Sequence, residues 1–184
     1  IGRGEEIHAE ISKKASLERS LLVGSALVYM YTKCGLLGTA KDVFDRLLFR
    51  DIVLCNALMT GYGHLGESSR VLNILQKMKQ EDIEPDATSF VCIINAYSHG
   101  GLLGKGQMYF TIISKYYGFT PTLDHYNCLV DLLGRTGSLE ESKYLLHTMP
   151  FLPDFVGWTA LLANCHSHGN VMLAKGLFNH ALEP

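Results

Sequence analysis

Residues 56–86 read NALMTGYGHLGESSRVLNILQKMKQEDIEPD, and this stretch decides the fold. Its first half places apolar residues two, three and six positions after Asn56 and then reaches Gly66, and its second half carries another apolar stripe. Both spacings are those of one face of a helix. Because glycine adopts a left-handed backbone without Cβ strain, we expect Gly66 to end the first helix. The stretch therefore predicts a pair of helices joined by a turn.

The same pattern recurs along the chain at spacings of 31, 35, 36 and 32 residues. The column that contains Asn56, whose members we call the anchor residues, consists of Ser25, Asn56, Val91, Asn127 and Thr159. Ten positions after each anchor comes a glycine: Gly35, Gly66, Gly101, Gly137 and Gly169. One hairpin of this size cannot bury its own apolar face, so neighbours must stack. The expected fold class is all-α, an α-solenoid of antiparallel helix-turn-helix hairpins with one concave and one convex surface.

Composition excludes several other classes of protein. The chain is 47% hydrophobic and 18% charged, which is typical of a folded domain, and its longest apolar stretch, Leu21 to Tyr31, is too short to cross a membrane. A net charge of −2 gives no general basic field to attract nucleic acid. The five cysteines form no C-x-x-C pair, so we expect no disulfide framework, no metal site and no cofactor.

The stretch 56–86 and the segment YNCLVDLLGRTGSLEESKYLLHTMPFLPD at 126–154 closely resemble plant pentatricopeptide repeats of the PLS subclass, which mixes long, standard and short units. The resemblance implies a right-handed superhelix. It also implies a division into a truncated preceding repeat at 1–20 (helix B only), a short unit at 21–51, a standard unit at 52–86, a long unit at 87–122, a short unit at 123–154 and an E motif at 155–184. A tetratricopeptide array would be expected to hold its spacing near about 34 residues instead.

In the family, the anchor and the last residue of its unit hydrogen-bond the Watson–Crick edge of one base. Carried over residue by residue, the base-reading pairs are Ser25 with Asp51, Asn56 with Asp86, and Asn127 with Asp154. A hydroxyl with Asp favours guanine and Asn with Asp favours uracil over cytosine, so the implied target is G, U, a loosely specified base, then U or C. The pair Val91 and Thr122 departs from this pattern and is expected to space rather than read.

Two further kinds of contact are implied by the same resemblance. Leu22 and Val53 match the apolar wedge that separates adjacent bases, whereas Asp124 at the equivalent place does not. Lys33 and Arg135 lie eight residues after their anchors, where they can meet phosphates. The alternative for these two cations is that they complement the helix dipole in a last helical turn.

The resemblance implies sequence-specific binding of single-stranded RNA in a mitochondrion or chloroplast. For members that end in this order it implies targeting of C-to-U RNA editing, with a deaminase or other editing factors recruited through the E motif. The zinc-binding H-x-E and P-C-x-x-C signature of a deaminase is absent from these residues, so we expect no catalytic residue here. The alternative function is a tetratricopeptide-like scaffold whose groove binds a peptide or partner protein.

Overall fold

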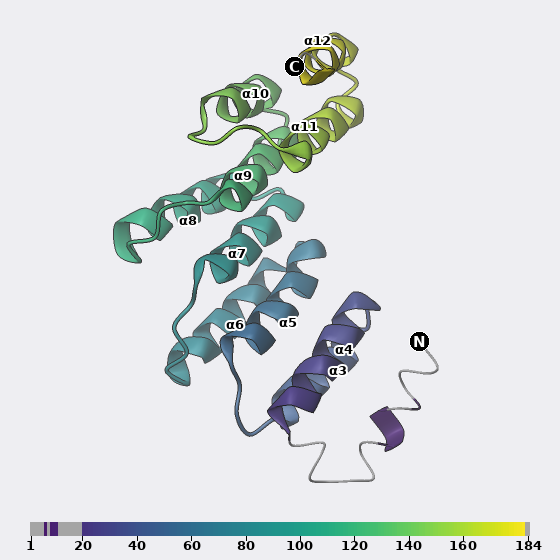
Figure 1. Cartoon of the computed structure of the whole chain (residues 1–184), viewed down its shortest axis with the longest axis vertical. Coiled ribbons are helices and arrows are strands. Elements are labelled where there is room, and N and C mark those ends of the chain that lie inside the picture. Colours follow the sequence, from purple (N-terminus) through teal and green to yellow (C-terminus); the bar gives the residue numbers. More distant parts are fainter. Residues whose placement is uncertain (1–5, 7, 11–19, 183–184) are drawn as a thin grey trace.

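The structure is a computed structural model that describes residue 6, residues 8–10 and residues 20–182. From residue 20 onward the described chain consists of helices that pair into successive hairpins, stacked along the long axis of the molecule (Figure 1). The predicted all-α solenoid is therefore confirmed. The expectation that residues 1–20 form the B helix of an incomplete unit falls largely on residues outside the described ranges.

The first helix of each hairpin, which we call the A helix, has 13 residues in every case: α3 (Leu21–Lys33), α5 (Ile52–His64), α7 (Ala87–His99), α9 (Leu123–Arg135) and α11 (Phe155–Ser167). The second helix, the B helix, varies from 10 to 14 residues: α4 (Leu37–Arg46), α6 (Ser68–Gln80), α8 (Leu103–Tyr116), α10 (Leu139–Thr148) and α12 (Val171–Leu182). The unequal spacing of the repeats is thus taken up by the B helices and the junctions that follow them.

The two kinds of helix form two layers. Each A helix packs extensively on the A helix of the next hairpin, whereas the B helices pack on A helices and not extensively on one another within residues 20–182. Because the more closely spaced layer of a curved stack is its inner one, the A helices line the concave side. The anchor residues all lie on A helices, so the fold places them in this inner layer.

Apolar residues in register build the core between the layers. The residue three positions after the anchor is fully buried in four hairpins, at Val28, Met59, Ile94 and Val130. Small residues let the two helices of a hairpin approach: Ala40 is fully buried, and the buried hydroxyl of Ser142 donates to the Val130 carbonyl at 2.7 Å. The repeated apolar stripe therefore forms a continuous stacking core.

The five glycines expected to end the A helices all have a left-handed backbone, with φ of 75°, 70°, 64°, 87° and 67° at Gly35, Gly66, Gly101, Gly137 and Gly169. Their surroundings differ. A Cβ at Gly66 would lie 2.9 Å from the Gly100 backbone nitrogen, whereas a Cβ at Gly101 would meet no atom within 4 Å. Gly66 is thus needed for close backbone approach as well as for its dihedral angle.

This difference predicts unequal costs for the same substitution. Gly101→Ala should lower the free energy of unfolding by about 1–2 kcal/mol, the cost of a left-handed alanine. Gly66→Ala should cost roughly 3 kcal/mol or more, because its Cβ also collides with backbone that cannot move away cheaply. Urea unfolding followed by circular dichroism measures both, and equal costs would contradict the assigned contact.

Candidate nucleic-acid interface

Three aspartates at the hairpin junctions are N-caps of the A helix that follows them. Asp51 accepts from the backbone N–H of Leu54 at 2.8 Å, Asp86 from that of Ser89 at 2.9 Å, and Asp154 from that of Gly157 at 2.9 Å. An Asp cap satisfies one of the free N–H groups at a helix start and complements the helix dipole. Each aspartate is thereby fixed at the entrance to an A helix.

Two of these aspartates also hold the anchor asparagine of the preceding hairpin. Asn56 Nδ2 donates to Asp86 Oδ1 at 3.0 Å, and Asn127 Nδ2 donates to Asp154 Oδ1 at 3.0 Å. The asparagine side chains are 8% and 4% exposed. The structure therefore joins both predicted Asn–Asp pairs across a hairpin junction and holds each amide in one orientation, because rotating it would set two oxygens against each other.

The other two junctions differ. The Ser25 hydroxyl is buried and makes no hydrogen bond within the described residues, so the structure does not join it to Asp51. The serine side chain is also shorter than the asparagine that reaches the aspartate at the two paired junctions. Val91 has no polar group, and Thr122 instead caps α9 with its hydroxyl 2.8 Å from His125 Nδ1.

The sequence analysis missed a further contact to the anchor asparagines, made by the residue three positions after each paired aspartate. Ser89 donates from its hydroxyl to Asn56 Oδ1 at 2.7 Å. Gly157 stands in the same place beside Asn127, whose Oδ1 is buried without a hydrogen-bond partner within the described residues. Ser89 occupies the capping-box position three residues after Asp86, and nothing local in the sequence indicates that its hydroxyl reaches 33 residues back.

A pocket of about 500 Å³ opens between α3 and α5 beside the first Asn–Asp pair, and its lining includes Tyr29, Lys33, Val53, Asn56 and Thr88. A cavity of this size is in the range of small-ligand sites. It brings together one predicted base-reading residue, one predicted wedge residue and one predicted phosphate contact.

The predicted wedge residues are among the most exposed apolar side chains of the described chain. Leu22 is 81% exposed and Val53 is 67% exposed. Val156, three positions before Thr159 and so in the same column, is 55% exposed and was missed by the sequence analysis. Asp124 and Thr88 occupy the column in the other two hairpins and are also exposed. The column thus presents apolar surface to solvent at the first, second and fifth hairpins.

The two predicted phosphate contacts stand in different electrostatic surroundings. Lys33 is exposed and lies 5.4 Å from the centroid of the Tyr29 ring, with no carboxylate partner among the residues that the structure describes. Arg135 is ion-paired through Nε to Asp131 at 2.6 Å. Asp131 also accepts from Ser98 at 2.7 Å and Asn164 at 3.1 Å, which links three consecutive A helices. The Arg135 charge is therefore locally compensated, and that of Lys33 is not.

The histidines in the same column as Lys33 contact each other. His64 and His99 pack edge to face with ring centroids 5.9 Å apart. Burial lowers the pKa of His99 below its ordinary value of 6.5, and the nearby Arg135 lowers it further. His99 is therefore neutral at pH 7.

Several cysteine thiols are buried, and the described residues form no metal-binding cluster. Burial raises the pKa of Cys55 and of Cys128 to about 12, so both thiols stay protonated. Among the described residues no group of three His, Cys, Asp or Glu side chains is placed to hold a metal ion. None of the helices within these ranges is long and apolar enough to span a membrane.

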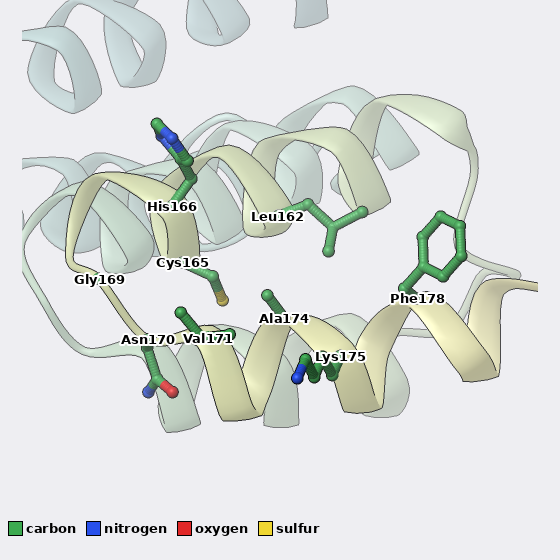
Figure 2. A pocket seen from close by; sticks show the side chains of 9 residues that line it. All are labelled: Leu162, Cys165, His166, Gly169, Asn170, Val171, Ala174, Lys175 and Phe178. Carbon is green, nitrogen blue, oxygen red and sulfur yellow. The ribbon is translucent and has the colours of Figure 1, made fainter.

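A second pocket, of about 530 Å³, lies between α11 and α12, where Leu162, Cys165 and Ala174 face one another and Phe178 closes one side (Figure 2). Phe178 is 56% exposed, although Phe44 and Leu146 in the same column are fully buried. In the preceding hairpin the next A helix covers this face, since Gly157 packs directly on Leu146. The pocket is therefore the apolar stacking face of the last described hairpin.

These features define a class: a helical-repeat protein whose inner layer holds two Asn–Asp pairs at its hairpin junctions, with exposed apolar residues in the column three positions before the anchors. Comparisons narrow this class. The PPR repeat family matches residues 50–99, and the PPR repeat matches residues 25–52 and 124–151, which together make up more than half of the chain. The chain belongs to the pentatricopeptide repeat family.

Relatives of known name agree with this assignment. The Arabidopsis thaliana pentatricopeptide repeat-containing protein At1g17630 is 38% identical over 100% of this chain and 25% of its own length, and At3g29230 is 37% identical over 100% and 30%. At3g02330, named as mitochondrial, is 38% identical over 92% and 19%. The chain thus spans about a quarter of the length of these relatives.

Solved structures show the same fold. Maize PPR10 in complex with an 18-nucleotide psaJ RNA element superposes with a TM-score of 0.78 at 18% identity, over 97% of this chain and 27% of that one. The PPR domain of Arabidopsis thaliana protein-only RNase P 1, in complex with tRNA, superposes with a TM-score of 0.62 at 16% identity, over 89% and 88%.

The junction at Thr122 predicts a pH-dependent stability. Burial lowers the pKa of the fully buried His125, whose Nδ1 accepts from the Thr122 backbone N–H at 3.1 Å. The unfolded chain therefore binds a proton more readily than the folded one, so stability is full at neutral pH and falls as pH drops below about 6.5.

Urea unfolding at about pH 7.5 and about pH 5.5 measures this effect. His125→Asn should be less stable at the higher pH but lose less on acidification. The exposed His168→Asn should keep the original pH dependence. A pH dependence that survives unchanged in His125→Asn would contradict the role given to His125.

Proposed function

We propose that the chain binds single-stranded RNA along the layer of A helices and reads bases with its anchor residues. The observation that carries this proposal is the pair of asparagine amides held by the aspartates that cap the next A helix. An amide fixed in this way keeps hydrogen-bonding capacity of defined direction, which is what discrimination of a base edge requires. Maize PPR10, which shares the fold, has been solved with a single RNA element on it.

The proposed units are the short one at 21–51, the standard one at 52–86, the long one at 87–122, the short one at 123–154 and the E motif at 155–184. This division is supported by the A helices, which begin at Leu21, Ile52, Ala87, Leu123 and Phe155. In the proposed reading, Ser25 with Asp51 prefers guanine, and the two Asn–Asp pairs prefer uracil over cytosine. The Ser25 hydroxyl is buried and makes no hydrogen bond within the described residues, so no group of these residues competes with a base for it.

Leu22 and Val53 are assigned to the separation of adjacent bases. Val156 is assigned the same role, because it is also an exposed apolar residue three positions before its anchor. Lys33 is the stronger candidate for a phosphate contact. Arg135 must either share its guanidinium with Asp131 or leave it, and its five N–H donors allow the first. Val91 and Thr122 are assigned no reading role.

At the level of the cell, we propose that the whole protein acts in a mitochondrion or chloroplast as a targeting factor for C-to-U RNA editing. The mitochondrial name of one relative supports an organelle. The chain would locate the site and supply no catalytic group, consistent with the lack of a deaminase signature in its sequence. We propose that a deaminase or another editing factor is recruited through the E motif at 155–184.

A peptide-binding scaffold is the competing proposal. The apolar α11–α12 pocket favours it locally, but the anchors of the inner layer favour RNA because two of them are amides held by carboxylates. A groove that binds a peptide does not require Asn–Asp pairs that recur at the spacing of the units.

Exchanging both asparagines tests the base assignment. The double variant Asn56→Ser and Asn127→Ser should shift the preference at two positions from pyrimidine to guanine, each by about tenfold in affinity, since one base contact is worth roughly 1–3 kcal/mol. Binding is measured with short single-stranded RNAs that match or scramble the proposed bases at one stated salt concentration. Asn73→Ser on the outer helix α6 is the matched control. An unchanged preference in the folded double variant would reject the assignment.

The phosphate role of Lys33 predicts a different signature. Lys33→Ala should weaken binding of all RNA sequences alike and reduce the slope of log affinity against log salt by about 0.7, the value for one phosphate on a single strand. Lys105→Ala, on the outer helix α8, should leave the slope unchanged. If Lys33 only complements the dipole of α3, its removal will lower stability without changing the slope.

A further inference from the structure

The two Asn–Asp pairs are identical in sequence but differ in the third residue that touches them. At the first pair, the fully buried Ser89 donates to Asn56 Oδ1 at 2.7 Å. At the second pair, the equivalent residue is Gly157, and Asn127 Oδ1 is buried without a partner within the described residues. A Cβ at Gly157 would lie 2.8 Å from that oxygen, so the carbonyl occupies the space that a side chain would need.

The amides of Asn56 and Asn127 therefore differ in the hydrogen-bonding group that each can still offer to a ligand. In both pairs Nδ2 is bonded to a carboxylate and keeps one further N–H. The Asn56 carbonyl already accepts from the Ser89 hydroxyl, which also lies 3.1 Å from Asp86 Oδ1, so the group that this amide chiefly still offers to a ligand is its second N–H. The Asn127 carbonyl bears an uncompensated loss of solvation until a donor reaches it.

We propose that the residue three positions after the closing aspartate sets how strictly an Asn–Asp unit distinguishes uracil from cytosine. This inference rests on the proposed RNA-binding function. On the Watson–Crick edge, uracil carries a ring N–H where cytosine carries a ring acceptor, and the donor of cytosine is the exocyclic amino group beside that ring nitrogen. The Asn127 carbonyl, facing the ring nitrogen, gains its missing donor from uracil and meets an acceptor in cytosine, whereas the remaining N–H of Asn56 can donate to an acceptor of either pyrimidine.

Ser89 and Gly157 are thus specificity-determining residues that act through the asparagine beside them. The unit of Asn127 is the strict one and the unit of Asn56 the tolerant one. This order of strictness is the reverse of that expected from sequence, in which Asn56 was assigned uracil and Asn127 either pyrimidine.

The test compares RNAs that carry the proposed bases and differ only by uracil or cytosine at the position opposite Asn56 or opposite Asn127. For the unaltered protein, exchanging uracil for cytosine opposite Asn127 should weaken binding about tenfold, and opposite Asn56 less than about threefold, at one fixed salt concentration. Ser89→Ala should raise the ratio opposite Asn56 to about tenfold, because the Asn56 carbonyl then lacks its donor.

Two further variants complete the comparison. Ser142→Ala removes an equally buried hydroxyl, one that donates to the Val130 carbonyl away from both pairs, and should leave both ratios unchanged. Gly157→Ala should lower the ratio opposite Asn127, because its Cβ displaces the carbonyl; thermal unfolding checks that the contact of this Cβ with Leu146 is tolerated.

Equal uracil-to-cytosine ratios at the two positions of the unaltered protein would overturn the inference, and this comparison needs no variant to fold. An unchanged ratio opposite Asn56 in a folded Ser89→Ala protein would overturn it as well. Both outcomes leave the proposed function intact, whereas a failure of the unaltered protein to distinguish matched from scrambled RNA would reject that function and this inference with it.

Discussion

In two of the junctions a single carboxylate oxygen makes two bonds that serve different purposes. Oδ1 of Asp86 accepts from the backbone of α7 and from the side chain of Asn56 on α5, and Oδ1 of Asp154 does the same between α11 and α9. The first bond starts the next A helix, and the second fixes the anchor of the previous one. The anchor is therefore held in place only when the next hairpin is stacked, so stacking and the proposed base recognition depend on the same contact.

Close approach between neighbouring hairpins adds further contacts to this coupling. Gly66 approaches the backbone of the next hairpin at Gly100, and Gly134 lies against the Asn164 side chain. Asn164 in turn bonds to Asp131, which holds Arg135. Asn164 therefore takes part both in the close approach of α9 and α11 and in the network that orients Arg135. With a net charge of −2, the chain has no general attraction for a polyanion, so the position of the few inner-layer cations matters more than their number.

The sequence was sufficient for features that depend on local backbone or on a repeated pattern. The glycine column fixed the ends of the A helices because a left-handed residue is a local requirement, and the apolar columns fixed which faces are buried. The Asn–Asp contacts were expected only through family resemblance. The sequence did not predict the bond from Ser89 to Asn56 or the Asp131 network, because these bonds join residues 33 positions apart whose types have ordinary local explanations as caps or surface charges. It also did not predict that the Asn127 carbonyl lacks a partner within the described residues.

The unequal lengths of the repeats raise the question of how a groove can present its anchors regularly. The A helices all have 13 residues and start four positions before their anchors, whereas the B helices have 10, 13, 14, 10 and 12 residues. Added residues therefore lengthen the outer layer, where neighbouring helices are not tightly packed on one another. The inner layer keeps one helix per unit with one register. The hairpin of α7 and α8, which has the longest B helix, can then carry the apolar Val91 at its anchor position without shifting the anchors on either side of it.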